Sequence, residues 1–231
     1  MSERDGGRAA EHVDAAMLSL WQAANHLSQV PPPPCEHFRV TIFGSARIQP
    51  GDALYTDVKE LARALSALGC DIVSGGGPGL MQAANEGSQL GDPDDRQQSI
   101  GVRIDLPFEQ SANPFVEKVY THATFFTRLH QFMRLSDAFV VVAGGVGTTL
   151  ELLLVWQLLQ VRHATGVPLV LVGPMWRDLV GWAHRHMLGG PTAYASPADL
   201  ALPTCVDTPA EALAVLRPFH ERFAARRAAP R

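Results

Sequence analysis

The 231-residue sequence has few lysines, few cysteines and no long apolar run. Lys59 and Lys118 are its only lysines, so a reaction that proceeds through a Schiff-base lysine has just two candidates. The three cysteines include no CxxC pair, which argues against both a disulfide framework and a zinc site. No apolar run reaches the roughly 20 residues that a membrane-spanning helix needs, so we expect no membrane partner.

The sequence also lacks a large excess of charge of either sign. Charged residues make up 18% of the chain and the formal net charge is −4, whereas a protein that binds nucleic acid should carry a basic stripe. We therefore expect no nucleic-acid partner. Residues 1–14 are charged and lack the apolar stretch of a signal peptide, so we expect a cytoplasmic protein. Hydrophobic residues make up 46% of the chain, which suffices at this length for a sizeable core.

A separate helix is expected near the N-terminus. Its apolar residues recur at spacings of four and three and so share one narrow stripe: Val13, Met17, Leu20, Ala24 and Leu27. The stripe can dock on the parent domain or on a second subunit. The run Pro31–Pro34 then predicts a stiff, extended linker. We divide the chain into a helix with its linker at 1–37, a catalytic domain at 38–225 and a frayed tail at 226–231.

From residue 38 onward, short apolar runs alternate with helical patterns. We expect strands at 38–43, 71–74, 99–106, 115–121, 138–143, 167–172 and near 205–206. Helices are expected at 54–68, 80–89 and 125–136, between the turn at 144–147 and residue 161, around Trp176 and Trp182, and from Pro209. This alternation predicts parallel pairing through right-handed crossovers. The expected fold class is α/β: a doubly wound, Rossmann-like parallel sheet with helices on both faces.

The first of two glycine-rich turns follows the second expected strand. It reads Ser74-Gly75-Gly76-Gly77-Pro78-Gly79-Leu80-Met81. Its backbone can approach a ligand closely, and the helix that follows offers unpaired N–H donors to an anion. No Lys-Ser/Thr pair follows the last glycine, so this is not a Walker A loop. The structural alternative is that the glycines serve only the geometry of a tight turn.

The second turn follows the strand expected at 138–143 and reads Ala143-Gly144-Gly145-Val146-Gly147-Thr148-Thr149-Leu150-Glu151. Thr148 stands where its hydroxyl can join backbone amides in binding a phosphate. Glu151 is either a functional carboxylate or the capping-box partner of Thr148. Arg128 lies near the start of the preceding helix. It can project toward the carboxyl ends of the strands, where ligands bind in sheets of this kind.

Together these motifs resemble the lonely-guy (LOG) family of cytokinin-activating phosphoribohydrolases. The signatures of that family are a GGGxxGLM turn, a PGGxGTxxE turn and an arginine-bearing helix that ends in Ser-Asp-Ala-Phe, here residues 136–139. Phe43-Gly44-Ser45-Ala46-Arg47, Leu106–Gln110 and Asn113-Pro114 are similar to the longer, type II branch. The resemblance covers roughly residues 38–174. Ala143, Leu129 and Leu150 depart from the family pattern.

The resemblance implies hydrolysis of the N-glycosidic bond of nucleoside 5′-monophosphates to free base and ribose 5-phosphate. AMP and N6-substituted AMP, such as cytokinin ribotides, would be the substrates. Arg128 and Glu151 would be the catalytic pair, without cofactor or metal. Substrate and phosphate would be bound by residues of the turns: Gly44, Ser45, Gly75, Gly76, Gly77, Gly79, Met81, Gly144, Gly145, Gly147 and Thr148. The family also forms homodimers or higher homo-oligomers, and the apolar helix after residue 147 favours the same assembly here.

Three other functions compete with hydrolysis. Molybdenum-cofactor carriers share the fold without hydrolysing their ligand, so a non-hydrolytic nucleotide or molybdenum-cofactor carrier is the alternative. The presence of both Arg128 and Glu151 favours the enzyme, because a carboxylate near the anomeric carbon stabilises a cationic transition state. Relatives are often labelled lysine decarboxylases, an activity that needs a Schiff-base lysine. Lys59 and Lys118 both lie outside the glycine motifs, which argues against decarboxylation. An NAD-dependent oxidoreductase should carry GxGxxG after the first strand, and that motif is missing there.

Overall fold

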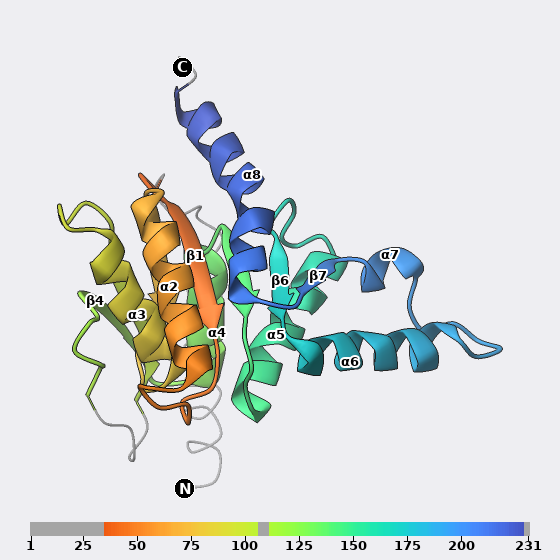
Figure 1. Cartoon of the computed structure of the whole chain (residues 1–231). Coiled ribbons are helices and arrows are strands. Elements are labelled where there is room, and N and C mark those ends of the chain that lie inside the picture. The colour runs from red at the N-terminus through yellow and green to blue at the C-terminus, as the bar shows by residue number, and fades with distance from the viewer. Residues whose placement is uncertain (1–34, 106–110, 229–231) are drawn as a thin grey trace, which may run out of the picture. The chain divides into compact units, whose positions relative to one another are not determined.

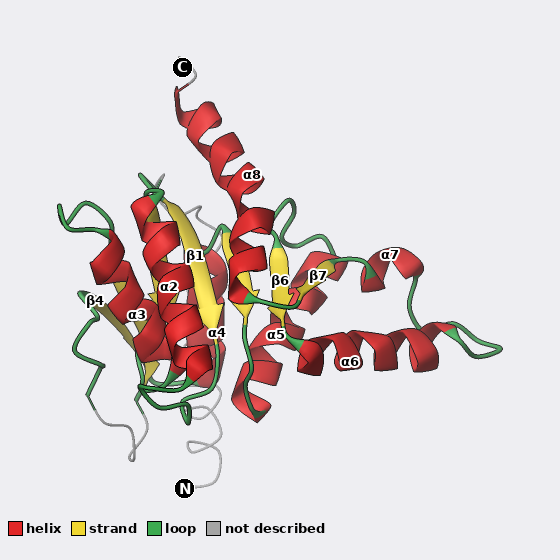
Figure 2. Ribbon diagram, in the orientation of Figure 1, coloured by secondary structure: helices red, strands yellow, loops and turns green. Residues whose placement is uncertain are grey.

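The described part of the chain forms a seven-stranded sheet covered by helices (Figure 2). The computed structural model describes residues 35–105 and 111–228, so the expected N-terminal helix and almost all of its linker lie outside the described residues. The strands are β1 (Phe38–Phe43), β2 (Cys70–Ser74), β3 (Ser99–Ile104), β4 (Lys118–His122), β5 (Ala138–Val141), β6 (Leu169–Val172) and β7 (Pro203–Val206).

The order of the strands fixes where a ligand can bind. The order is β4-β3-β2-β1-β5-β6-β7, and every neighbouring pair is parallel. The chain builds outward from β1 to β4 and then returns to the other side of β1 with β5. In doubly wound sheets this reversal leaves a crevice beyond the carboxyl ends of the two central strands, and ligands bind there. The predicted fold class is confirmed.

The helices form a layer on each face of the sheet (Figure 1). On one face lie α2 (Ala53–Ala67), α3 (Leu80–Gly91) and α8 (Pro209–Ala228), and on the other lie α4 (Phe125–Leu135), α5 (Val146–Gln160) and α6 (Pro174–Ala183). Alternate residues of β1 serve the two layers: Val40 and Ile42 are buried against the first, and Phe43 is buried against the second. Burial on both faces explains why the strands read as continuous apolar runs.

Several element boundaries differ from the expectation. β4 begins at Lys118 because Asn113 first forms a turn, in which Val116 N donates to its carbonyl (3.2 Å) and Phe115 N to its side chain (3.1 Å). A π-helical turn, η1 (His184–Leu188), and a short helix, α7 (Pro197–Leu200), were not predicted. α8 continues to Ala228, past the expected end of the domain at residue 225. None of the described helices is long and apolar enough to cross a membrane.

Two glycines let α2 and α3 approach each other at the level of the backbone. A Cβ atom on Gly87 would overlap the carbonyl oxygen of Lys59 and lie 2.9 Å from Ala62 Cβ. A Cβ atom on Gly91 would overlap the carbonyl oxygen of Arg63. Because α3 begins directly after the first glycine turn, this close packing also fixes the position of that turn.

Gly87→Ala should lower the free energy of unfolding by about 1–3 kcal/mol, because the overpacked helices have to separate. Gly181→Ala is the matched control, since a Cβ atom there would meet only the end of the Arg185 side chain, at 3.4 Å. At that position in α6, alanine should leave the stability unchanged or raise it by up to about 1 kcal/mol. Urea unfolding measures both variants. Equal effects of the two substitutions would contradict the packing argument.

Candidate functional site

Loops from three strands meet beyond the carboxyl ends of β1, β2 and β5. Ser45 N donates to the carbonyl of Ala143 (3.0 Å), and the carbonyl of Ser45 accepts from Leu80 N (2.9 Å). A Cβ atom on Gly44 would lie 2.7 Å from Val142 Cγ2. Gly44 and Ser45, predicted to contact substrate, therefore hold the loops together. The N–H of Ser45 is already used within the protein.

The glycines of the first turn also have neighbours within the protein. Gly79 has φ +71°, and a Cβ atom there would overlap the carbonyl oxygen of Ser45. A Cβ atom on Gly75 would lie 2.6 Å from Arg128 Nη2, and one on Gly77 would lie 2.8 Å from Met81 Cε. The glycine-rich run thus gives the Arg128 and Met81 side chains room to lie over the turn. Packing within the protein therefore explains part of the glycine-rich run, and this part needs no ligand.

A buried polar network holds the first turn in shape. Ser74 Oγ donates to Asn85 Oδ1 (2.6 Å) and accepts from Gly76 N (2.9 Å). Asn113 Nδ2 donates to the carbonyl of Gly77 (2.9 Å) and to Asn85 Oδ1 (3.0 Å). Asn85 Nδ2 in turn donates to Ser99 Oγ (2.9 Å). Such satisfied buried networks specify a single conformation. Sequence reasoning missed this support, because Asn85 is one of several polar residues in α3 and nothing in the sequence marks it as buried.

Arg128 and Glu151 form a buried ion pair between α4 and α5. Arg128 Nη1 lies 3.1 Å from Glu151 Oε1, and only 12% and 11% of the two side chains is exposed. Arg128 Nε also donates to the carbonyl of Val102 in β3 (2.8 Å). The guanidinium group stacks over the Phe132 ring at 5.1 Å from its centroid. The two residues predicted as a catalytic pair are therefore in direct contact, and three elements hold the arginine.

Burial changes the acidity of Glu151. Removal from water raises the pKa of its carboxyl to about 7, while the charge and hydrogen bond of Arg128 act in the opposite direction with a smaller effect. A carboxyl with this pKa exchanges its proton near neutral pH, which suits a general acid or base. A buried, strongly perturbed carboxyl with one specific charge partner is typical of functional sites.

The structure excludes the capping-box interpretation of Glu151. The N-cap of α5 is Gly145, and no side chain makes a capping hydrogen bond there. Thr148 lies within the first turn of the helix and is buried, with its hydroxyl against Gly144. The carboxylate of Glu151 is bonded to Arg128 instead. The Glu151 position therefore serves the ion pair and does not serve the start of the helix.

A cleft of about 560 Å³ lies beside this pair. Gly75, Gly77, Met81 and Arg128 line it, as do Arg103 and Asn113. Among the residues that the structure describes, neither Glu151 nor the second glycine turn lines the cleft. Gly145 and Gly147 are exposed at the start of α5, and Cβ atoms there would meet nothing within 4 Å. The predicted site residues are thus divided between the cleft, the exposed second turn and the packing of the loops.

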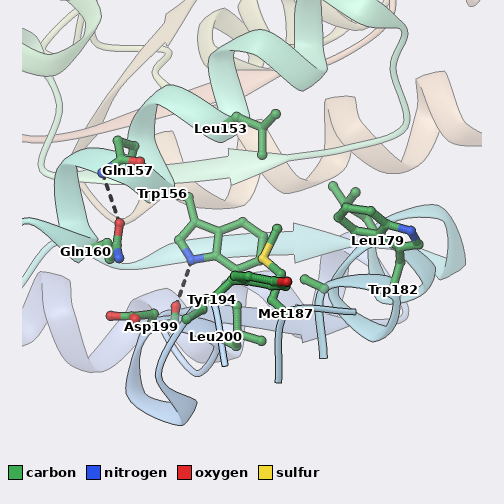
Figure 3. A pocket seen from close by; sticks show the side chains of 12 residues that line it. Leu153, Trp156, Gln157, Gln160, Leu179, Trp182, Met187, Tyr194, Asp199 and Leu200 are labelled. Carbon is green, nitrogen blue, oxygen red and sulfur yellow. Dashed lines mark hydrogen bonds between the residues drawn. The ribbon is translucent and has the colours of Figure 1, made fainter. Parts of the chain in front are cut away.

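A second cavity, of about 390 Å³, lies between α5, α6 and α7 (Figure 3). Trp156, Trp182, Met187 and Tyr194 contribute to its lining, and Trp156 Nε1 donates to the carbonyl of Asp199 (2.8 Å). Its described lining residues include no arginine or lysine. A cavity of this composition does not suit a phosphate, so the cleft beside Arg128 is the candidate functional site.

Comparisons with known proteins identify a family and two similar curated proteins. A family model described as "Possible lysine decarboxylase" matches residues 81–216. The pyrimidine/purine nucleotide 5′-monophosphate nucleosidase of Escherichia coli strain K12 is 28% identical over 171 residues, which cover 71% of this chain and 36% of that protein. The protein of strain O157:H7 matches equally. The chain thus spans about a third of the length of these curated relatives.

Solved structures share the fold at low identity. The molybdenum cofactor binding protein of Rippkaea orientalis superposes with a TM-score of 0.60 at 15% identity, covering 80% of this chain and 99% of that one. The molybdenum cofactor carrier protein of Chlamydomonas reinhardtii gives a TM-score of 0.57 at 18% identity, with 79% and 98% covered. At these identities the likeness establishes the Rossmann-like fold and nothing about the ligand.

The buried carboxyl of Glu151 should make the stability of the fold depend on pH. The group releases its proton near pH 4.5 when unfolded and near pH 7 when folded. The stability that the neutral carboxyl contributes is therefore fully present below pH 4.5 and is lost as the pH rises through about 7. As the pH rises from about 5 to about 8, the stability of Glu151→Gln should therefore increase relative to that of wild type. Urea unfolding at each pH measures this difference.

Glu60→Gln is the control for this experiment, because Glu60 is half-exposed and paired with Arg63 at 2.7 Å. Its stability relative to wild type should stay nearly constant over the same range. A constant difference between Glu151→Gln and wild type would contradict a raised pKa of Glu151.

Proposed function

This chain belongs to the family described as "Possible lysine decarboxylase", and we propose that it hydrolyses the N-glycosidic bond of nucleoside 5′-monophosphates. The products would be a free base and ribose 5-phosphate, with AMP and N6-substituted AMP, such as cytokinin ribotides, as substrates. The observation that carries the proposal is the buried Arg128–Glu151 pair at the carboxyl edge of the sheet. The name of the Escherichia coli relative supports the same bond as the target.

The chemistry of this bond calls for a carboxylate. As the bond from the ribose to the base breaks, positive charge builds on the sugar, and a nearby carboxylate stabilises it. Water then adds to the anomeric carbon, one of its protons is lost, and the departing base gains a proton. Glu151, whose pKa is about 7, is suited to accept the proton from water at neutral pH. Arg128 would orient the substrate through N–H groups other than those that bond Val102 and Glu151.

The position of Glu151 sets a condition on the substrate. Arg128 lines the cleft, and Glu151 lies against Arg128 with 9% of its surface exposed. For the carboxylate to contact the ribose, the substrate has to extend past the guanidinium group. Changing Glu151 is therefore the most direct test of whether the pair is catalytic.

The positions of the lysines argue against decarboxylation through a Schiff base. Lys59 Nζ pairs with Glu86 Oε1 (3.3 Å) between α2 and α3. Lys118 lies on the edge strand β4, over the Tyr120 ring at 5.4 Å from its centroid. Neither residue lines the cleft. A carbonyl substrate in the cleft would have no lysine beside it to form a Schiff base.

A non-hydrolytic carrier of a nucleotide or of the molybdenum cofactor is the second candidate, because a molybdenum cofactor binding protein and a molybdenum cofactor carrier protein from two other organisms have this fold. A carrier needs only cationic side chains and a cavity that fits its ligand. It gains nothing from a buried carboxyl that titrates near neutral pH. The Arg128–Glu151 pair therefore favours hydrolysis over carriage.

AMP should be cleaved while adenosine is left intact, because a phosphate is the group that the arginines of the cleft and the helix N-termini favour. The measurement is release of ribose 5-phosphate or ribose from a panel of nucleotides and nucleosides. Equal turnover of AMP and adenosine would contradict the proposed specificity. Tight binding of molybdopterin, with no cleavage of any monophosphate, would support the carrier.

Glu151→Gln should lower the turnover of AMP about 100-fold or more, because glutamine keeps the shape but not the charge that stabilises the transition state. Arg128→Ala should also lower it, and Arg128→Lys should recover little, since lysine lacks the planar fork. Melting temperature and nucleotide binding are the controls. Near-normal turnover by Glu151→Gln would remove this residue from the mechanism.

We also propose that copies of the chain associate through α4 and α5. Large apolar side chains are exposed along these helices: Phe125, Phe126, Val146, Leu150 and Leu153. Exposed apolar surface of this kind is typical of protein–protein contact sites. Light scattering at micromolar concentration should give at least twice the chain mass of 25.0 kDa. A monomeric mass would refute the association.

A further inference from the structure

The described residues that line the cleft beside Arg128 carry charge of one sign. Arg103 and Arg128 are the charged residues among the described side chains that line it, and no aspartate or glutamate is among those residues. Cavities lined by one sign of charge concentrate ligands of the opposite sign. The described lining therefore favours an anion.

Arg128 alone is poorly suited to hold that anion. Its Nε donates to the carbonyl of Val102, and its Nη1 donates to Glu151. When Glu151 is ionised, its negative charge offsets that of the arginine. A phosphate monoester carries between about −1.5 and −2 charges at neutral pH. The ligand therefore calls for a second cation.

Arg103 enters the cleft from β3, directly after the residue that holds Arg128. Val102 is buried in the layer of α4 and α5, and successive residues of a strand point to opposite faces. The stem of Arg103 passes over the first glycine turn, where a Cβ atom on Gly76 would lie 3.0 Å from Arg103 Cγ. Gly76, with φ +71°, thus leaves room for the arginine stem.

From this arrangement we propose that Arg103 binds the phosphate of the ligand and makes the site selective for phosphate esters over the corresponding uncharged sugars or nucleosides. The inference rests on the proposed function for the identity of the ester, a nucleoside 5′-monophosphate. It differs from the assignment based on family resemblance, which gives the phosphate to the glycine turns and Thr148. A guanidinium fork can make two parallel hydrogen bonds to one phosphate, which a lysine cannot.

The test is calorimetric titration of the full chain with ribose 5-phosphate, inorganic phosphate and ribose. Ribose 5-phosphate is a product of the proposed reaction and is not consumed during the titration. Arg103→Gln should weaken its binding about tenfold to a hundredfold, as expected for lost charge-assisted hydrogen bonds. Binding of ribose should not change. Arg103→Lys should restore only part of the affinity, and it serves as the second variant if Arg103→Gln does not fold.

Arg63→Gln is the matched control, because Arg63 lies on the exposed side of α2 and pairs with Glu60. It should bind all three probes as wild type does. If Arg103→Gln or, where that variant does not fold, Arg103→Lys also binds ribose 5-phosphate like wild type, the proposal is overturned. A loss confined to Thr148→Val would place the phosphate at the second glycine turn and overturn it as well.

Turnover of AMP, measured in parallel, separates this inference from the proposed function. If wild type cleaves no monophosphate but its binding of ribose 5-phosphate depends on Arg103, the phosphate site stands and the hydrolytic function falls. If wild type cleaves AMP and Arg103→Gln changes neither KM nor the binding of ribose 5-phosphate, the function stands and the role of Arg103 falls. Failure of wild type to bind any of the three probes overturns the phosphate site.

Discussion

The main constraint on this molecule is the buried ion pair between the carboxylate of Glu151 and the guanidinium group of Arg128. Burying two charges costs free energy that their mutual attraction offsets only when the geometry is good and the remaining polar atoms are bonded. The protein meets this condition from three sides. The carbonyl of Val102 accepts from Arg128 Nε, the Phe132 ring lies under the guanidinium, and α5 presents Glu151 at 3.1 Å. Moving α4, α5 or the end of β3 would break the pair.

The glycine turns illustrate how packing and function share one sequence. Gly44 and Gly79 let the loops after β1 and β2 touch, and Gly75 leaves space for Arg128. These roles are structural, yet each of them brings the arginine and the cleft together. The second turn is different, because Gly145 and Gly147 meet no protein atom that a Cβ would displace. These two glycines therefore leave the start of α5, a helix end that favours anions, exposed to solvent.

The sequence was sufficient to predict the fold, because alternation of apolar runs with helical patterns leaves few topologies other than a parallel, doubly wound sheet. The family resemblance pairs Arg128 with Glu151, but their contact could not be derived from the strand order, because β4 and β5, the strands that precede them, are separated by three other strands. Nor could the Asn85–Asn113 bond be derived, because it joins residues 28 positions apart through a turn with no regular pattern. In the sequence, Arg103 looks like any other strand residue. Only the structure shows that its side chain lies over Gly76. Likewise, the position of Gly145 as N-cap and the bond from Arg128 to Glu151, neither visible in the sequence, decide against a capping box at Glu151.

The central claim is that Glu151 acts as a carboxylate whose pKa burial has raised. Its most direct test is the pH dependence of kcat/KM for AMP, which reports the ionisation of groups in the free enzyme. If the ionised carboxylate is required, kcat/KM should fall as the pH drops below about 7. A profile that stays flat down to about pH 5, with its acid limb near the ordinary glutamate value of 4.5, would contradict the account.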